Sequence, residues 1–109
     1  MIFIAVRFTV RPDHADRWLD LVDDFTRATR AEPGNLFFDW SRSVDDPHVF
    51  VLLEAFADAD AGAAHVASAH FTAGLAAMAG AISTTPEIIN VEVPQQGWGA
   101  MAELAPTDN

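Results

Sequence analysis

The sequence of 109 residues contains no cysteine and no tyrosine. Without cysteine the chain can form no disulfide bond and offers no thiolate, which fits a reducing compartment. Without tyrosine it has no phenol side chain that could relay a proton. No apolar run approaches the ~20 residues of a membrane-spanning helix, and the opening stretch MIFIAVRFTV lacks the basic leader and cleavage site of a signal peptide. We therefore expect a cytoplasmic protein.

Basic side chains are also scarce. The chain has 6 Lys or Arg residues and 16 Asp or Glu residues, which gives a formal net charge of −10. Such a surface repels phosphate backbones and anionic lipid headgroups. Neither nucleic acid nor a membrane is therefore expected as a partner. A neutral or apolar small molecule is not affected by this argument and remains a possible ligand.

Four stretches have the period-two alternation, or the apolar and aromatic composition, that is typical of β-strands. They are residues 2–10, 35–43, 48–56 and 87–93. Pro12 and Asp13 end the first strand, and we expect Asp13 to cap an amphipathic helix. A second helical segment opens at Asp58 or Asp60 and extends toward Ile82. The order βαββαβ over residues 1–93 predicts an α+β, ferredoxin-like fold with a four-stranded antiparallel sheet.

Both faces of the predicted sheet are apolar, although two helices can cover only one of them. A second copy of the same sheet, packed face to face, is the simplest cover for the other, so we expect a homodimer. The tail 94–109 has no place in a minimal fold, and we expect its apolar residues to pack at the dimer interface. The residues assigned to the second face are Phe3, Ala5, Phe37, Val49, Val51 and Leu53, or the alternate residues of the same strands, and the apolar tail residues are Trp98, Met101 and Leu104.

A set of short motifs recurs in order along the chain. Glu-x-Gly-x-Leu precedes the second strand, Asp-Pro forms the following turn, a Glu lies near the end of the third strand, and Ala-x-x-His is followed by His-Phe. The residues are Glu32, Gly34, Leu36, Asp46, Pro47, Glu54, His65, His70 and Phe71. This pattern resembles the antibiotic biosynthesis monooxygenase (ABM) domain family, and the resemblance spans residues 1–93.

The resemblance implies a dimeric α+β barrel with a pocket between the sheet and the helices of each monomer. Members of the family include cofactor-independent oxygenases of quinols and phenols, haem-degrading monooxygenases, and an isomerase of a small sugar derivative. Haem-degrading members share an Asn on the first strand and a Trp at the end of the third, where this chain has Arg7 and Phe56. That difference argues against haem, and no motif for a flavin, a nicotinamide or a metal is present. We expect no cofactor.

His65 and Glu54 are the candidate catalytic residues. His65 can act as a base or hydrogen-bond donor in the pocket, because imidazole titrates near neutral pH; alternatively it is a structural histidine. Glu54 lies in the apolar stretch VFVLLEAF, so its carboxylate must find partners or raise its pKa. It either binds or deprotonates a phenol, or fixes the tautomer of His65; alternatively it has a structural role with backbone amides or an arginine.

His70 lies at a helix joint and is a weaker candidate for the pocket. On a continuous helix, five residues correspond to a rotation of about 140°. His65 and His70 would then point apart, and only a kinked helix would bring them together on a metal, so no metal site is expected.

Five further residues are candidates for substrate binding, each with an ordinary structural role as the alternative. Asn35 could donate to a substrate carbonyl, and Arg7 could hold an anionic oxygen or pair with a carboxylate at the interface. The aromatic residues would form a flat apolar slot for a planar ring. They are Phe38, Trp40 and Phe56.

The sequence favours a cofactor-independent monooxygenase that oxidises a quinol or polycyclic phenol with O₂. Two alternatives remain open. One is an isomerase or lyase of a small oxygenated metabolite on the same fold. The other is a non-catalytic dimer that binds a small aromatic molecule.

Overall fold

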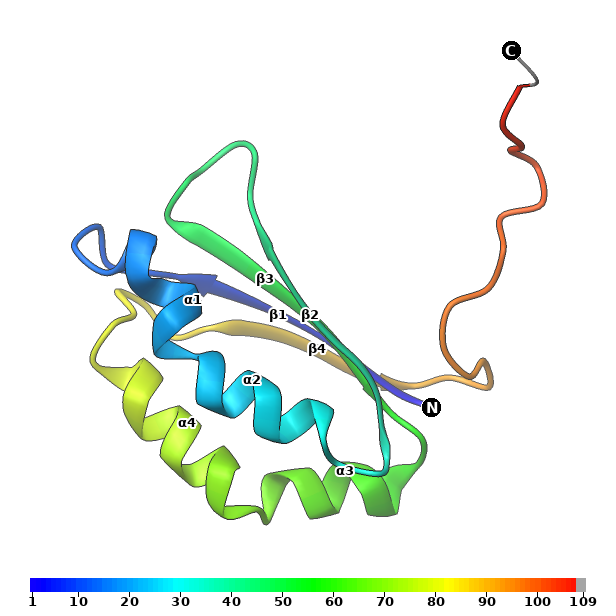
Figure 1. Ribbon diagram of the computed structural model, residues 1–109, viewed down its shortest axis with the longest axis horizontal. Coiled ribbons are helices and arrows are strands. Elements are labelled where there is room, and N and C mark those ends of the chain that lie inside the picture. The colour runs from blue at the N-terminus through cyan, green and yellow to red at the C-terminus, as the bar shows by residue number, and fades with distance from the viewer. Residues whose placement is uncertain (108–109) are drawn as a thin grey trace.

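The four strands form where the alternation predicts them. The computed structural model describes residues 1–107, and the last two residues of the predicted tail lie outside this range. All neighbouring strands are antiparallel, and their order across the sheet is β2-β3-β1-β4. This order and the helices on one face confirm the α+β ferredoxin-like fold (Figure 1). The strands are β1 (Ile2–Thr9), β2 (Asn35–Arg42), β3 (Val49–Phe56) and β4 (Glu87–Glu92).

Both helical regions are divided into shorter pieces. The first consists of η1 (Ala15–Arg17), α1 (Trp18–Leu21) and α2 (Asp23–Arg30), and the second of α3 (Ala59–Val66) and α4 (Ala69–Ala79). No helix within residues 1–107 is long and apolar enough to cross a membrane. The expected Asp13 cap is wrong, because the first turn has no side-chain cap and the Asp13 carboxylate lies 2.9 Å from the His14 ring instead.

The break in the second helical region has a clear local cause. The Asp58 carboxylate caps α3 by accepting a hydrogen bond from the Ala61 amide at 2.8 Å. Ten residues later the Ser68 hydroxyl caps a new helix, α4, by accepting from the Phe71 amide at 3.1 Å. A residue whose side chain caps a helix has extended rather than helical backbone, so Ser68 ends one helix as it begins the next. The chain therefore changes direction just after His65.

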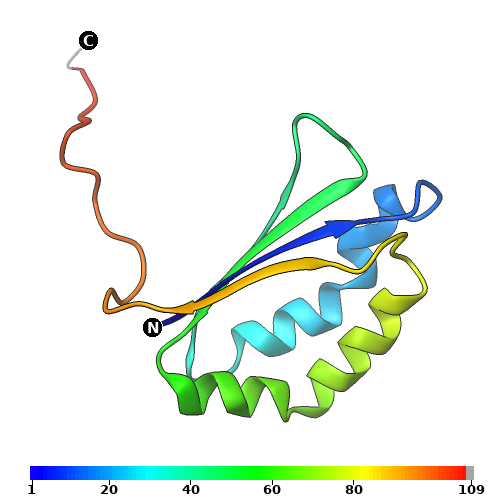
Figure 2. The ribbon, with the colours of Figure 1, turned by 180° about the vertical axis from the view of Figure 1, so that it is seen from behind.

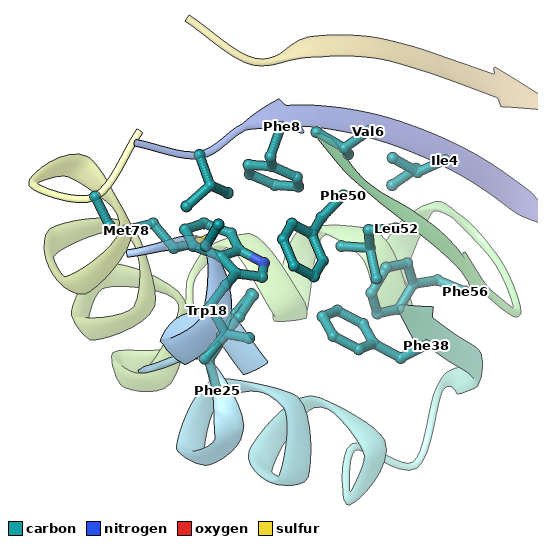
Figure 3. Packing of buried hydrophobic residues seen from close by; sticks show 14 residues of the cluster. Ile4, Val6, Phe8, Trp18, Phe25, Phe38, Phe50, Leu52, Phe56 and Met78 are labelled. Carbon is teal, nitrogen blue, oxygen red and sulfur yellow. The ribbon is translucent and has the colours of Figure 1, made fainter. Parts of the chain in front are cut away.

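The hydrophobic core fills the space between the sheet and the helices (Figure 3). Aromatic rings from both layers meet there, and Trp18 of α1 contacts Phe8 of β1 and Phe50 of β3, with ring centroids 5.4 and 6.1 Å apart. On the helical side, α2 and α4 approach closely at Gly74. A side chain there would meet the Phe25 ring at 2.7 Å, so the contact needs a residue without Cβ.

The opposite face of the sheet carries the apolar residues assigned to it. In β1, Ile4, Val6 and Phe8 are buried on the helical side, so Phe3 and Ala5 point the other way. The tail leaves this face at the end of β4 and extends away from the body (Figure 2). Trp98 stays beside the sheet, 5.4 Å from the Phe37 ring, yet is 71% exposed. The radius of gyration is 15.5 Å, against about 13 Å for a compact chain of this length, which reflects this extended tail.

Candidate functional site

A cavity of about 270 Å³ lies between the sheet and the helices. Its floor comes from β1, β3 and β4, and its walls come from α2, α3 and α4. Only three of the residues that line it are polar, namely Glu54, His65 and Asn90. Apolar sites with a few convergent polar groups are typical of small-molecule binding sites. The apolar walls include Phe25, Leu52, Phe71, Leu75, Met78 and Ile88.

His65 is held in place by Glu32, which lies in the loop before β2. Its Nδ1 atom is 2.7 Å from Oε2 of Glu32, and Nε2 of His70 lies at the same distance from the same oxygen. The loop reaches α3 because Gly34 has no side chain: a Cβ there would lie only 2.3 Å from the Cβ of Ala61. A carboxylate accepts hydrogen bonds and cannot donate them, so both ring nitrogens donate to Glu32.

The two histidines converge because the helix is broken. His65 is the penultimate residue of α3 and His70 the second residue of α4. The prediction that the rings point apart is valid only for a continuous helix, and it is wrong here because Ser68 starts a new helix in a different direction. His70 lines neither the cavity nor its rim. Its position as a second donor to Glu32 gives it a role in fixing that carboxylate.

The Nε2 atom of His65 faces the cavity. Because Nδ1 donates to Glu32, the neutral ring carries its free electron pair on Nε2. The side chain is 4% exposed, and the only carboxylate near Nε2 within residues 1–107 is Glu54, with Oε1 at 3.7 Å. Phe56 stacks on the other side of the ring with a centroid distance of 4.7 Å. A buried imidazole that is oriented by a carboxylate has the arrangement of a general base.

Glu54 has an unusual environment for a carboxyl group. It lies on the helical face of β3 and is 5% exposed. Burial raises its pKa to about 7, and the nearby negative charge of Glu32 contributes to the same shift. At neutral pH a substantial fraction of the molecules therefore carries a protonated Glu54 beside the imidazole of His65. Groups of this kind, with an acid and a base side by side, are common at catalytic sites.

Other residues predicted to bind substrate lie away from the cavity. The Asn35 amide donates to the backbone oxygens of Phe37 and Ala55, at 3.0 and 3.2 Å. Phe38 is fully packed in the core, 1% exposed. Trp40 packs against Phe8 and donates to the Thr26 hydroxyl at 2.9 Å. None of the three lines the cavity, because the bulky side chains of β2 are covered by α1 and α2.

Arg7 is the clearest correction among the predicted site residues. It lies on the face of the sheet opposite the helices and pairs with Glu87 of the adjacent strand β4 at 2.8 Å. Both side chains are more than half exposed. Arg7 therefore cannot contact a ligand in the cavity, and its carboxylate partner comes from its own chain. Of the candidates, only His65 and Glu54 line this cavity, while Phe56 borders His65.

Two residues of the site were not recognised as such from the sequence. Glu32 was noted only as part of a motif, because 33 positions separate it from His65. Asn90 is the only polar residue in the middle of the apolar stretch IINV. Its side-chain orientation follows from the pairing of Ile4 with Asn90, since buried Ile4 faces the helices. That pairing is a long-range contact, and the alternation within β4 alone does not reveal it.

Glu32, His65 and His70 also offer ligand atoms that lie within 4.8 Å of one another. A carboxylate and two imidazoles are groups that zinc or iron can bind. Here the two ring nitrogens and the carboxylate oxygen already satisfy one another by hydrogen bonding at 2.7 Å.

Comparison with known proteins places the chain in a family. Residues 1–77 match the family model ABM, described as "Antibiotic biosynthesis monooxygenase". The chain is 26% identical over 95 residues to "Putative monooxygenase YcnE" of Bacillus subtilis (strain 168), which covers 87% of this chain and 100% of that protein. This α+β domain with a histidine-containing apolar cavity therefore belongs to the antibiotic biosynthesis monooxygenase family.

Solved structures agree with this assignment. The chain superimposes with a TM-score of 0.80 and 26% identity on a "Putative antibiotic biosynthesis monooxygenase" from Nitrosomonas europaea, over 87% of this chain and 100% of that one. A protein with the same description from Caulobacter crescentus CB15 gives a TM-score of 0.81 and 26% identity, over 86% and 90% of the two chains. Both matches extend well beyond the cavity and cover nearly the whole ferredoxin-like domain.

Proposed function

We propose that this protein is a cofactor-independent monooxygenase that inserts one atom of O₂ into a quinol or a closely related phenol. The observation that carries the proposal is the position of His65. Its Nδ1 is bound to Glu32 at 2.7 Å, and its Nε2 faces an apolar cavity beside Glu54. Removal of a proton from an electron-rich ring makes that ring able to reduce O₂ directly. The buried apolar walls, among them Phe25, Leu52 and Met78, shield the reactive anion from water on that side.

The proposed reaction begins with transfer of a hydroxyl proton from the substrate to Nε2 of His65. Glu32 stabilises the imidazolium that forms, as a carboxylate does for other catalytic histidines. The substrate anion gives two electrons to O₂, which forms a C–O bond at a ring carbon, and the resulting peroxide takes the proton back from His65 to become a hydroperoxide.

The O–O bond of this hydroperoxide then breaks. A protonated Glu54 donates to the departing hydroxide, which leaves as water. The same ring carbon loses its hydrogen as a proton to His65, which returns it to Glu54, and the carbon keeps the other oxygen. For a quinol the balance is quinol plus O₂ to hydroxyquinone plus water. One oxygen atom ends in the ring and one in water, so no external reductant is required.

The cavity size favours a small substrate. About 270 Å³ lies just below the ~300–1,000 Å³ of sites for drug-sized molecules. A ring system of one or two fused rings fits this volume better than the larger polycyclic phenols that the family resemblance also suggested. A naphthoquinol is therefore the preferred test substrate.

The proposal is tested with menadiol and ¹⁸O₂ in the presence of a metal chelator. We expect the hydroxylated quinone to contain one ¹⁸O atom, with the second in water, at a rate well above autoxidation. His65→Ala should reduce this rate by at least 100-fold, whereas His48→Ala, at a partly exposed histidine outside the cavity, should leave it unchanged. An unlabelled product with hydrogen peroxide would indicate simple oxidation and contradict the proposal. Turnover without O₂ would favour an isomerase or lyase, and binding without turnover would favour a binding protein.

A further inference from the structure

A second cavity beside His65 lies along α3 and shares lining residues with the first. The second cavity has a volume of about 470 Å³ and is lined largely by small or apolar residues, including Ile2, Ala59, Gly62 and Ala63. Both cavities share His65 and Asn90. Asn90, an exposed residue on the helical side of the edge strand β4, therefore borders both cavities together with His65, which is buried.

The register of the sheet fixes the position of Asn90 relative to Glu54. Ile4 of β1 pairs with Glu54 of β3 on one side and with Asn90 of β4 on the other. The three residues form one row across the sheet, and all three line the cavity. Adjacent strands are ~4.8 Å apart, so the backbones of Glu54 and Asn90 are about 10 Å apart, with the apolar side chain of Ile4 between them.

The polar groups of the cavity lie at the two opposite ends of this row. One end has Glu54 and His65, which lie 3.7 Å apart. The other end has the Asn90 carboxamide, which, unlike that of Asn35, is not used in a side-chain hydrogen bond within residues 1–107. A flat ring lying on Ile4 would present one edge to the acid and base and the opposite edge to Asn90.

We propose that Asn90 binds a second oxygen atom of the substrate, on the opposite side of the ring from the hydroxyl that His65 deprotonates. The preferred substrate class is then a ring with oxygen atoms at positions 1 and 4, a true quinol, rather than a phenol with one hydroxyl. This inference rests on the proposed function of the same cavity. The amide N–H donates to the second oxygen as it gains carbonyl character, and the amide oxygen accepts from the corresponding hydroxyl before reaction.

The inference is tested by binding without turnover. Dissociation constants for 1,4-dihydroxynaphthalene and for 1-naphthol, which lacks only the second oxygen, are measured by calorimetry in the absence of O₂. We expect the wild-type protein to prefer the diol by about tenfold, as one additional hydrogen bond provides. Asn90→Leu, which keeps the side-chain size without a polar group, should abolish this preference while changing the affinity for 1-naphthol by less than about twofold.

Two further variants complete the experiment. Asn90→Ser retains a hydroxyl donor and should keep part of the preference. Glu92→Gln, on the same strand and outside both cavities, should keep all of it. An Asn90→Leu protein that still prefers the diol would overturn the inference, even if ¹⁸O incorporation confirms the oxygenase. A preference that Asn90→Leu abolishes, in a protein without oxygenase activity, would leave the inference standing and refute only the proposed reaction. Failure of wild type to bind either compound would overturn both.

Discussion

The Nε2 atom of His65 and the Oε1 atom of Glu54 lie 3.7 Å apart, and both side chains are less than one-tenth exposed. This distance is too long for a direct hydrogen bond but short enough for their charges to interact. A substrate oxygen that lies beside this pair, rather than between the two atoms, can contact both groups. The pKa of Glu54, raised to about 7, makes this relationship sensitive to pH near neutrality.

The first prediction concerns stability. The folded protein holds the Glu54 proton up to about pH 7, whereas the unfolded chain releases it near its ordinary value of 4.5. Between these pH values the folded state binds more protons than the unfolded state, so stability decreases as pH rises and is then constant above about 7. The shift corresponds to a loss of about 3 kcal/mol.

Glu54→Gln removes this titration and should therefore lose less stability than wild type between pH 4.5 and pH 8. Urea denaturation of both proteins at several pH values measures the difference. Glu92→Gln, the same exchange at an exposed acid on β4, serves as the matched control and should follow the wild-type curve. Parallel curves for wild type and Glu54→Gln would show that Glu54 is already ionised in the folded protein.

The second prediction concerns the pH dependence of the reaction. If protonated Glu54 supplies the proton for O–O cleavage, enzymatic ¹⁸O incorporation should fall as pH rises through about 7. Uncatalysed oxidation of a quinol changes in the opposite direction, because the quinol itself ionises at higher pH. Glu54→Gln should react at least tenfold more slowly, and its rate of ¹⁸O incorporation should no longer fall as the pH rises. An enzymatic rate that rises steadily with pH would assign the carboxylate of Glu54 as a base instead.

The third prediction separates the base from the residue that orients it. Glu32→Gln removes the charge that stabilises the His65 imidazolium but keeps a side chain of similar size. We expect kcat to fall by about 10- to 100-fold with a small change in KM, because Glu32 does not line the cavity. His70→Ala leaves the Glu32–His65 contact in place and should have a smaller effect on kcat. Equal losses in the two variants would instead indicate that the network acts only by holding the helices together.

Much of the fold follows from local patterns in the sequence. The strands begin or end within one or two residues of their predicted limits, because alternation over eight residues is a strong signal. The motif residues His65 and Glu54 were also recognised as a pair. Their orientation relative to each other was not, since it depends on the helix break at Ser68. A single serine in an alanine-rich segment does not distinguish a cap from an ordinary helical residue.

The remaining differences between the sequence-based predictions and the structure come from long-range contacts. Arg7 is predicted at the interface or in the pocket; it lies on the face opposite the helices rather than in the pocket, and the register of β1 with β4 places Glu87 directly beside it. Asn90 was not considered, because its neighbour Ile4 is 86 residues away. Trp40 and Phe38 were assigned to a ligand slot, but the helices that follow β1 cover them. Local periodicity identifies which residues are apolar, whereas strand order determines which of them meet a ligand.

The fourth prediction tests how the loop before β2 positions Glu32. In Gly34→Ala the new methyl group would overlap the Ala61 side chain on α3. The loop and helix must then separate, at a cost of about 1–3 kcal/mol, and the Glu32–His65 hydrogen bond should lengthen. Urea denaturation and the ¹H chemical shift of the His65 Nδ1 proton measure the two effects. Gly80→Ala is the control, because nothing lies within 4 Å of its position, and it should change stability by less than about 1 kcal/mol.

The fifth prediction concerns the uncovered face of the sheet. We propose that a second copy of the chain covers it, because Phe3, Phe37, Val51 and Leu53 are apolar and no helix lies over them. Sedimentation of the wild-type protein at micromolar concentration should then give twice the 11.8 kDa of one chain. Val51→Arg places an unpaired charge at the centre of this face and should yield monomers. Val44→Arg, at a turn residue that is 99% exposed, should remain dimeric. A wild-type monomer would show that the face is exposed to solvent, and the cavity would then have to function without support from a partner.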